Sequence, residues 1–311
     1  MRILVTGAAG YIGSILTPML LKSGHEVIAL DNLMYDQEAP LHSCCHYSGF
    51  ESVRGDARNK DVVSKLIKQV DCIIPLAAIV GEPACNQDHL TTTATNLEAV
   101  LLILKLRSKN QIIIYPNSNS GYGIGQEGIY CTEETPLRPI SHYGRTKVWA
   151  EEAVLVSDNT LAFRLGTVAG LSPRLRLDLM VNEFVYRALT DRCIVLYEAS
   201  FKRNFLHVRD AAKAFLHAIA NFEKMKGQVY NVGQSEANLS KLEICQEIKK
   251  QLPEFYIHES PIGQDPDKRN YIVSNAKIER TGFKAKITLQ ETITELIKGL
   301  RFVRQKRYRN A

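Results

Sequence analysis

The segment 2–13 limits the possible folds more than any other part of the chain. It reads RILVTGAAGYIG: a short apolar run, a loop with Gly7, Gly10 and Gly13, and the start of a helical pattern. The first glycine permits a tight turn, the second lets backbone N–H groups approach a phosphate, and the third lets helix and strand pack closely. The segment therefore predicts a strand–loop–helix unit that binds the pyrophosphate of a dinucleotide.

Short apolar runs alternate with helical patterns through the first half of the chain. Continuously apolar strands that alternate with helices are typical of a parallel sheet covered on both faces. We therefore predict an α/β fold, with a Rossmann-type doubly wound parallel sheet over 1–170. The expected strands cover 2–7, 26–31, 50–55, 72–77, 111–116 and 159–165, and the expected helices about 11–23, 60–69, 87–108 and 141–157.

The pattern becomes irregular after about residue 171. Short strands (CIVLY, QVYNV) and helices at about 208–223 and 240–252 follow at uneven spacing. This half predicts a smaller α/β substrate-binding lobe over 171–311, with segments returning to the main sheet.

Two acidic residues at strand ends indicate which dinucleotide binds. Asp31 ends the second expected strand, and no arginine follows it directly. A carboxylate there can hydrogen-bond the ribose hydroxyls and repel a 2′-phosphate, which predicts NAD rather than NADP. Asp56 could lie near the adenine amino group, although a helix-capping role fits almost as well. The remaining expected cofactor contacts are Tyr11, Ile12, Asn32, Ala57, Leu76, Ala77 and Ala78.

The sequence YGRTK places Tyr143 and Lys147 four residues apart at the start of a helical pattern. Residues at this spacing share one face of a helix. A tyrosine phenol has an ordinary pKa of about 10, and a nearby ammonium or an oxidised nicotinamide ring favours the phenolate. The pair predicts that Tyr143 is the general base for a sugar hydroxyl. A surface tyrosine above a lysine is the alternative for these two residues taken alone.

Taken together, TGAAGYIG, Asp31, Ser118, Tyr143 and Lys147 resemble the extended short-chain dehydrogenase/reductase family, the NAD-dependent epimerases and dehydratases of nucleotide-activated sugars. The resemblance implies that Ser118 hydrogen-bonds the reacting sugar oxygen. It also implies that Lys147 binds the nicotinamide ribose and that Asn96 lies beside the cofactor.

The stretch NSNSGYG departs from one branch of that family. The 4,6-dehydratases carry an acidic pair directly after the serine or threonine, whereas this chain has Asn119 and Ser120. Neither side chain is a strong acid or base. Dehydration is therefore disfavoured, and Asn119 and Ser120 are expected to contact the substrate instead.

Several segments narrow the resemblance further. IVGEPAC, CTEETPLRPIS, SPRLRLDLMVN and DPDKRNYIVSN resemble the NAD-dependent dehydrogenases that oxidise C4 of GDP-D-glycero-D-manno-heptose in capsule polysaccharide biosynthesis. The favoured interpretation is therefore oxidation of a nucleotide sugar to a 4-keto sugar. The alternative is a 4-epimerase, which performs the same oxidation and then returns the hydride to the other face.

Arginines in the second half of the chain are expected to hold the substrate's phosphates. The guanidinium fork matches phosphate oxygens. Arg203 and Arg269 match family positions at the diphosphate or nucleoside, and Asn182 matches an asparagine at the phosphate. Arg174 and Arg176 are near-equal candidates. Each arginine could instead be a surface cation.

Charge and composition argue against nucleic-acid, metal-binding and membrane proteins. The net charge is +6 and the chain ends in RFVRQKRYRN, but no nucleic-acid motif accompanies these charges, so a solvated helix end is the better interpretation. The cluster HSCCH at 42–46 lacks the usual metal-ligand spacing, and no metal is expected. No apolar run approaches the roughly 20 residues that cross a bilayer. We expect a cytoplasmic protein with reduced cysteines.

The expected partner is a nucleotide-diphosphate sugar, with GDP favoured, rather than nucleic acid or a membrane. The resemblance implies a homodimer, or a dimer of dimers, built through segments 87–108 and 141–157. A non-catalytic protein that only senses NAD is the rival from another class. The presence of Ser118, Tyr143 and Lys147 argues against it.

Overall fold

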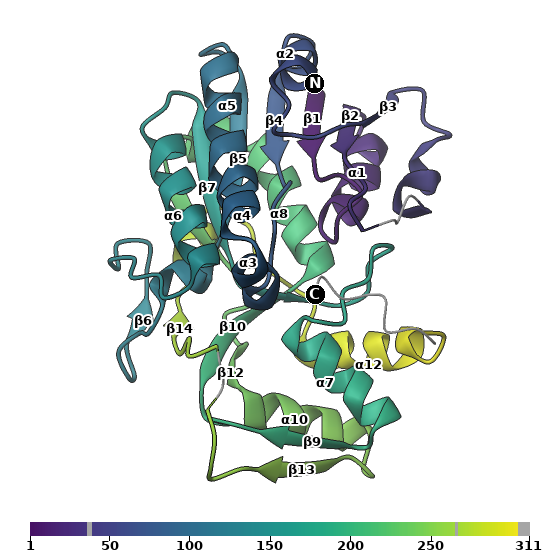
Figure 1. Cartoon of the computed structure of the whole chain (residues 1–311), viewed down its shortest axis with the longest axis vertical. Helices are drawn as coiled ribbons and strands as arrows, with labels where there is room; N and C mark the ends of the chain where they lie inside the picture. Colours follow the sequence, from purple (N-terminus) through teal and green to yellow (C-terminus); the bar gives the residue numbers. More distant parts are fainter. Residues whose placement is uncertain (36–38, 265–266, 304–311) are drawn as a thin grey trace.

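A seven-stranded parallel sheet forms the centre of the molecule (Figure 1). The computed structural model describes residues 1–35, 39–264 and 267–303. Neighbouring strands follow the order β11-β7-β5-β4-β1-β2-β3, and every pairing is parallel. The strands are β1 (Arg2–Thr6), β2 (Glu26–Asp31), β3 (Phe50–Arg54), β4 (Cys72–Pro75), β5 (Ile112–Ser118), β7 (Thr160–Leu165) and β11 (Val229–Val232).

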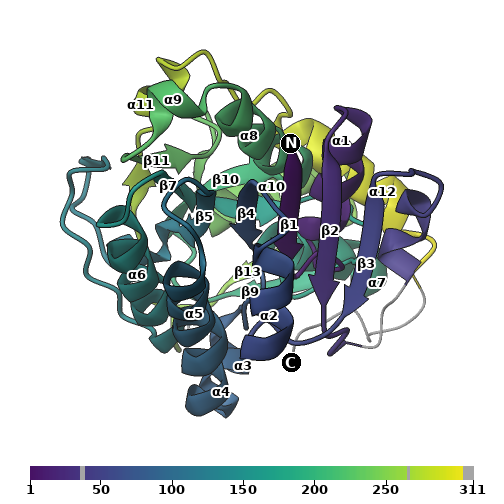
Figure 2. The ribbon, with the colours of Figure 1, turned by 90° about the horizontal axis from the view of Figure 1, so that it is seen from above.

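Helices cover both faces of this sheet, which confirms the predicted doubly wound fold (Figure 2). Side chains alternate across a strand, so Ile3 and Val5 of β1 pack into one layer and Leu4 into the other. The first layer contains α1 (Gly13–Lys22) and α8 (Val208–Ala220). The second contains α2 (Lys60–Ile67), α5 (Ala99–Leu106) and α6 (His142–Leu155).

The long helix expected over 87–108 is interrupted. Asp88 is extended, with φ of −146°, and its carboxylate accepts the Thr91 N–H, so a new helix, α4 (His89–Thr93), begins there. A π-helical turn (Ala94–Glu98) then leads into α5. An N-capping aspartate satisfies the free N–H groups of a helix start. The helical pattern of the sequence runs through this segment and does not reveal the break.

A smaller lobe packs below the C-terminal ends of the sheet strands (Figure 1). Its core consists of buried residues such as Val181, Ile244 and Leu296. Its elements are α7 (Met180–Thr190), α10 (Lys241–Gln251), α12 (Leu289–Leu300), the three-stranded sheet β12 (Asn238–Ser240), β10 (Lys202–His207), β8 (Thr167–Ala169), and the pair β9 (Cys193–Leu196) with β13 (Tyr256–Glu259).

Short elements complete the structure: α3 (Glu82–Gln87), α9 (Phe222–Met225), α11 (Ala276–Glu279), β6 (Tyr130–Cys131), β14 (Ile272–Val273) and 3₁₀ turns at Ala39–Cys44 and Asn119–Tyr122. Within the described ranges, no group of three or more histidine, cysteine or acidic side chains is placed to hold a metal. No helix of the described part is long and apolar enough to cross a bilayer. From residue 304 onward, the basic tail lies outside the described residues.

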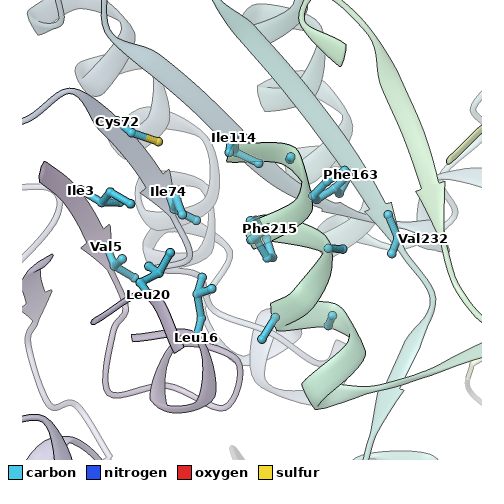
Figure 3. Packing of buried hydrophobic residues seen from close by; sticks show 14 of the residues in the cluster. Ile3, Val5, Leu16, Leu20, Cys72, Ile74, Ile114, Phe163, Phe215 and Val232 are labelled. Atoms are coloured by element: carbon cyan, nitrogen blue, oxygen red, sulfur yellow. The ribbon is translucent and has the colours of Figure 1, made fainter. Parts of the chain in front are cut away.

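Phe215 of α8 provides a test of this packing. It is fully buried against Phe163 of β7, with ring centroids 5.3 Å apart (Figure 3). Phe215→Ala should lower the free energy of unfolding by about 3–5 kcal/mol, because it leaves a cavity between helix and sheet. Urea titration measures this. Phe302→Ala, at an exposed position, is the control and should change the value by less than about 0.5 kcal/mol.

Candidate active site

One cavity of about 930 Å³ lies between the strand ends and the smaller lobe. Ligands of open α/β sheets bind outside the carboxyl ends of the strands, where this cavity opens. Residues from the glycine loop, the β2, β4, β5 and β7 ends, the start of α6 and the smaller lobe all line it. The fold therefore gathers most of the predicted site residues at one place.

The glycine loop has no room for a side chain at Gly7 or Gly13. Gly7 has a φ of +69°, and a Cβ on it would lie 2.6 Å from Ala77 N. A Cβ on Gly13 would lie 2.4 Å from Gly7 O. These close approaches keep backbone at the cavity wall, as a pyrophosphate-binding loop requires. Tyr11 and Ile12 line the wall with it, and Leu76, Ala77 and Ala78 line the facing strand end.

Asp31 faces the cavity with its carboxylate held in place. Its Oδ2 accepts the Ala9 N–H at 2.9 Å, and its Oδ1 accepts the Leu33 N–H at 2.8 Å. A carboxylate has about four lone-pair sites, so acceptor capacity remains for ribose hydroxyls. The contact to Ala9 ties this carboxylate to the glycine loop.

Asp56 lies at the same end of the cavity, together with Asn32 and Ala57. Its partner is Arg58, which donates from Nε and Nη2 at 2.9 and 2.7 Å. That hydrogen bond is the main cause of a pKa of Asp56 lowered to about 2. Sequence reasoning missed Arg58, because a cation two residues after an aspartate is too common a pattern to be informative.

Ser118, Tyr143 and Lys147 all line the cavity. Ser118 ends β5, and its Oγ accepts the Ser120 N–H at 3.2 Å. The Ser118 hydroxyl hydrogen takes no part in this bond and remains available to another acceptor. Tyr143 and Lys147 lie in the first two turns of α6, whose N-cap residue Ser141 accepts the Gly144 N–H.

Burial and the charged groups around Tyr143 include influences of opposite sign on its pKa. Burial raises the pKa of Tyr143 to about 12. Arg269, Arg176 and a hydrogen bond with Ser118 lower that pKa in part. Two guanidinium groups of the smaller lobe are thus among the cations that favour the phenolate.

Burial acts on Lys147 in the opposite sense. It lowers the pKa of Lys147 to about 7, while the Glu151 carboxylate raises it. The Lys147 Nζ lies 4.3 Å from the centre of the Tyr115 ring. A fully buried ammonium costs free energy unless an anion compensates it. Lys147 is therefore close to the balance between its charged and neutral forms at neutral pH.

Glu151 belongs to a buried network beneath these residues. Its carboxylate accepts hydrogen bonds from Nη2 and Nε of Arg164, at 2.7 and 3.1 Å, and from the Asn117 Nδ2 at 2.5 Å. Asn117 Oδ1 in turn accepts the Ser118 N–H at 2.7 Å. The network links the β5 end that carries Ser118 to the helix that carries Tyr143. Sequence reasoning missed it, because its members are far apart in the chain.

Four predicted site residues do not line the cavity. The Asn96 amide is buried and bonds both backbone groups of Ile79, so it shapes the wall from behind. Asn182 is bound to the backbone of Gly170 and Arg176. Asn119 and Ser120 are buried, and within the described part of the chain their side-chain polar atoms have no hydrogen-bond partner. The structure thus brings neither Asn119 nor Ser120 to the substrate space.

The four predicted arginines all reach the cavity. Arg176 pairs with Asp178 at 2.5 Å, and the Arg174 guanidinium lies 4.3 Å from the centre of the Tyr35 ring. Arg203 and Arg269 both contact Asp267. The cavity therefore has two basic walls, each with an aspartate beside it, in positions suited to a ligand with several negative charges.

The chain is similar in sequence and in structure to known enzymes. Residues 3–233 match the family described as the NAD-dependent epimerase/dehydratase family. An uncharacterized UDP-glucose epimerase, YtcB, of Bacillus subtilis is 29% identical over 76% of this chain and 78% of its own length. The UDP-glucose 4-epimerase of Lactobacillus helveticus is 26% identical over 80% and 81%. The Thermus thermophilus UDP-glucose 4-epimerase in complex with NAD superposes with a TM-score of 0.83, 25% identity and coverage of 97% and 99%.

The chain belongs to the NAD-dependent epimerase/dehydratase family of nucleotide-sugar enzymes. Its cofactor is NAD, as predicted, and the glycine loop and Asp31 fit that dinucleotide. The narrower resemblance to GDP-heptose 4-dehydrogenases stays a prediction, because the relatives named above are described as UDP-glucose epimerases.

Asp31 should determine the preference for NAD over NADP. Asp31→Ser removes the acceptor for the ribose hydroxyls and the charge that repels a 2′-phosphate. We expect the dissociation constant for NAD to rise about tenfold, with NADP affinity unchanged or higher. Calorimetric titration with both dinucleotides measures this, with the exposed Asp158→Ser as control. An undiminished preference for NAD would contradict the assignment.

Lys147 should lose its proton near pH 7 in the enzyme without ligands, since burial lowers its pKa to about 7. NMR of ¹⁵N-lysine-labelled protein can follow it, with Lys147→Met to assign the signal. Glu151→Gln should move the midpoint to lower pH, because the carboxylate raises this pKa. Glu152→Gln, on the exposed side of the same helix, should leave it in place. A midpoint above about pH 9 in the unsubstituted enzyme would refute this account.

Proposed function

We propose that the protein is a nucleotide-sugar 4-epimerase that works through a transient 4-keto sugar. The observation that carries this proposal is the position of Ser118, Tyr143 and Lys147 on the wall of the cavity that the glycine loop also lines. The relatives named as 4-epimerases support this interpretation over net oxidation, which the sequence favours.

Three side chains share the proton chemistry at C4. Tyr143 takes the proton of the C4 hydroxyl and later returns it. Ser118, whose Oγ already accepts the Ser120 N–H, donates its own hydrogen to the same sugar oxygen and fixes its position. Lys147 holds the nicotinamide ribose and supplies positive charge to the site when protonated. NAD, when bound, would supply the hydride acceptor for C4 and, once reduced, the hydride donor.

The basic walls account for the choice of ligand. The pair Arg174 and Arg176 and the pair Arg203 and Arg269 suit a diphosphate between a nucleoside and a sugar. Binding energy from this part of the substrate, which does not react, holds C4 in place against Tyr143. We assign the diphosphate to these arginines and leave Asn182 as the residue that fixes the Arg176 backbone.

Dehydration does not fit the site. Asn119 and Ser120 follow Ser118 where the dehydratases carry acids, and neither reaches the cavity. A second candidate, net oxidation of a GDP-heptose to its 4-keto form, rests on the sequence segments that resemble such dehydrogenases. It uses the same three residues, and it differs in releasing the ketone.

We also propose that the enzyme is a homodimer that pairs through α5 and α6. Leu101 of α5 and Trp149 of α6 are large apolar residues that remain 41% and 46% exposed, and apolar residues that join into an exposed patch mark interaction surfaces. The break at Asp88 leaves α5 and α6 as the continuous parts of the two expected segments.

The reaction can be identified by NMR of the products formed with NAD from UDP-glucose, UDP-glucuronic acid and a GDP-heptose. We expect a C4-inverted alcohol in equilibrium with its substrate and no net NADH. A released 4-keto sugar with stoichiometric NADH would instead establish the dehydrogenase.

Tyr143→Phe should lower kcat at least about 100-fold and retain NAD, because it removes the base and leaves the glycine loop intact. Undiminished turnover by this variant would show that Tyr143 is not the base.

A further inference from the structure

Two of the arginines assigned to the diphosphate are already held by one carboxylate of the chain itself. Arg269 donates from Nε to Asp267 Oδ1 at 2.6 Å and from Nη2 to Asp267 Oδ2. Arg203 Nη2 lies 3.2 Å from the same Oδ1 and also donates to the Asp267 main-chain oxygen. All three residues line the cavity. A single acidic side chain thus bridges two guanidinium groups at the wall.

The two arginines favour the charged form of this carboxylate. Burial alone would raise the pKa of Asp267, but hydrogen bonds and charge from Arg269, with the charge of Arg203, hold it far below its usual range. Arg203 is 1% exposed, and its guanidinium lies 5.6 Å from the centre of the Tyr271 ring. Burial without an anion would disfavour the Arg203 charge. Asp267 therefore gives these arginines a counter-charge before any ligand arrives.

A phosphate offers a guanidinium the same pair of acceptor oxygens as a carboxylate does. Asp267 consequently engages the donors that a diphosphate would use at this wall. The negative charge of Asp267 lies within hydrogen-bond distance of both guanidinium groups. A diphosphate held by the same groups would be repelled by it, because like charges repel strongly at short range in a partly buried site. The N–H groups of Arg203 and Arg269 that bind Asp267 are therefore not available to a diphosphate at the same time.

We propose that Asp267 competes with the substrate's diphosphate for Arg203 and Arg269 and thereby weakens the binding of nucleoside diphosphates. This inference rests on the proposed function, since it assumes a diphosphate ligand. Substrate and product of an epimerase carry the same diphosphate, so very tight binding of that group would hold both equally and delay product release. A built-in competitor reduces this uniform binding.

The test measures, by calorimetry, the binding of UDP, GDP and inorganic pyrophosphate to the NAD-loaded enzyme. Asp267→Asn keeps the shape and removes the charge. We expect it to lower the dissociation constants of all three ligands about tenfold and to leave the affinity for uridine, which has no phosphate, unchanged. Asp191→Asn is the matched control, because Asp191 is exposed at the end of α7, away from the cavity arginines. It should behave as the unsubstituted enzyme does.

Unchanged or weaker binding of UDP and pyrophosphate to Asp267→Asn would overturn the proposal and make Asp267 a residue that orients the arginines. A crystal structure of the unsubstituted enzyme with NAD and UDP tests it without any variant. We expect the Asp267 carboxylate to have released Arg203 or Arg269 to the phosphates. A carboxylate that keeps both arginines while UDP is bound would refute the competition. An unsubstituted enzyme that binds none of the three ligands would instead contradict the proposed function, and the inference with it.

Discussion

The buried ion pair between Glu151 of α6 and Arg164 of β7 is the interaction on which the arrangement of the site depends. Both side chains are almost fully enclosed, and the carboxylate oxygens meet Nε and Nη2 of the guanidinium. Buried charges are stable only when geometry and further hydrogen bonds compensate their lost hydration. Here Asn117 and Tyr122 provide those bonds, to the carboxylate and the guanidinium respectively. The position of α6 relative to β5 is therefore fixed by polar contacts as well as by apolar packing.

A second set of contacts ties the segment 170–176, which carries two of the cavity arginines, to the glycine loop. The Tyr11 hydroxyl donates to Gly170 O at 2.6 Å, and the Ser172 hydroxyl donates to Tyr11 O at 2.7 Å. Asn182 holds the same segment from the side of α7, through Gly170 and Arg176. The segment is thus attached to the loop suited to the pyrophosphate of NAD. Such attachment keeps two ligands in register, which is the main requirement for hydride transfer between them.

The sequence predicts the parts of this structure that depend on local spacing. The glycine loop, the strand–helix alternation and the Tyr143–Lys147 pair each occupy one short stretch, so the residues that define them are visible together. The Glu151–Arg164 pair and the Asp267 bridge join residues that only the fold brings together or orients, and nothing in the local pattern distinguishes them from surface charges. Asn119 and Ser120, which the sequence predicts to contact the substrate, are a further example of what local pattern does not show. Both are buried in the 3₁₀ turn that Ser118 caps.

The electrostatic balance of the site depends on groups that belong to both lobes. Burial favours the neutral forms of Tyr143 and Lys147 alike, with a pKa of about 12 for the phenol and about 7 for the amine. Arg269 and Arg176 are protein cations that favour the phenolate, and these same arginines suit the diphosphate. A bound diphosphate would screen their charge at Tyr143. Asp267 and Asp178 already do so in part, because each is paired with one of these arginines. If a diphosphate replaces Asp267 or Asp178 as the partner of these arginines, one anion takes the place of another. The electric field at Tyr143 would then change less than it would if a diphosphate bound to arginines that had no anionic partner.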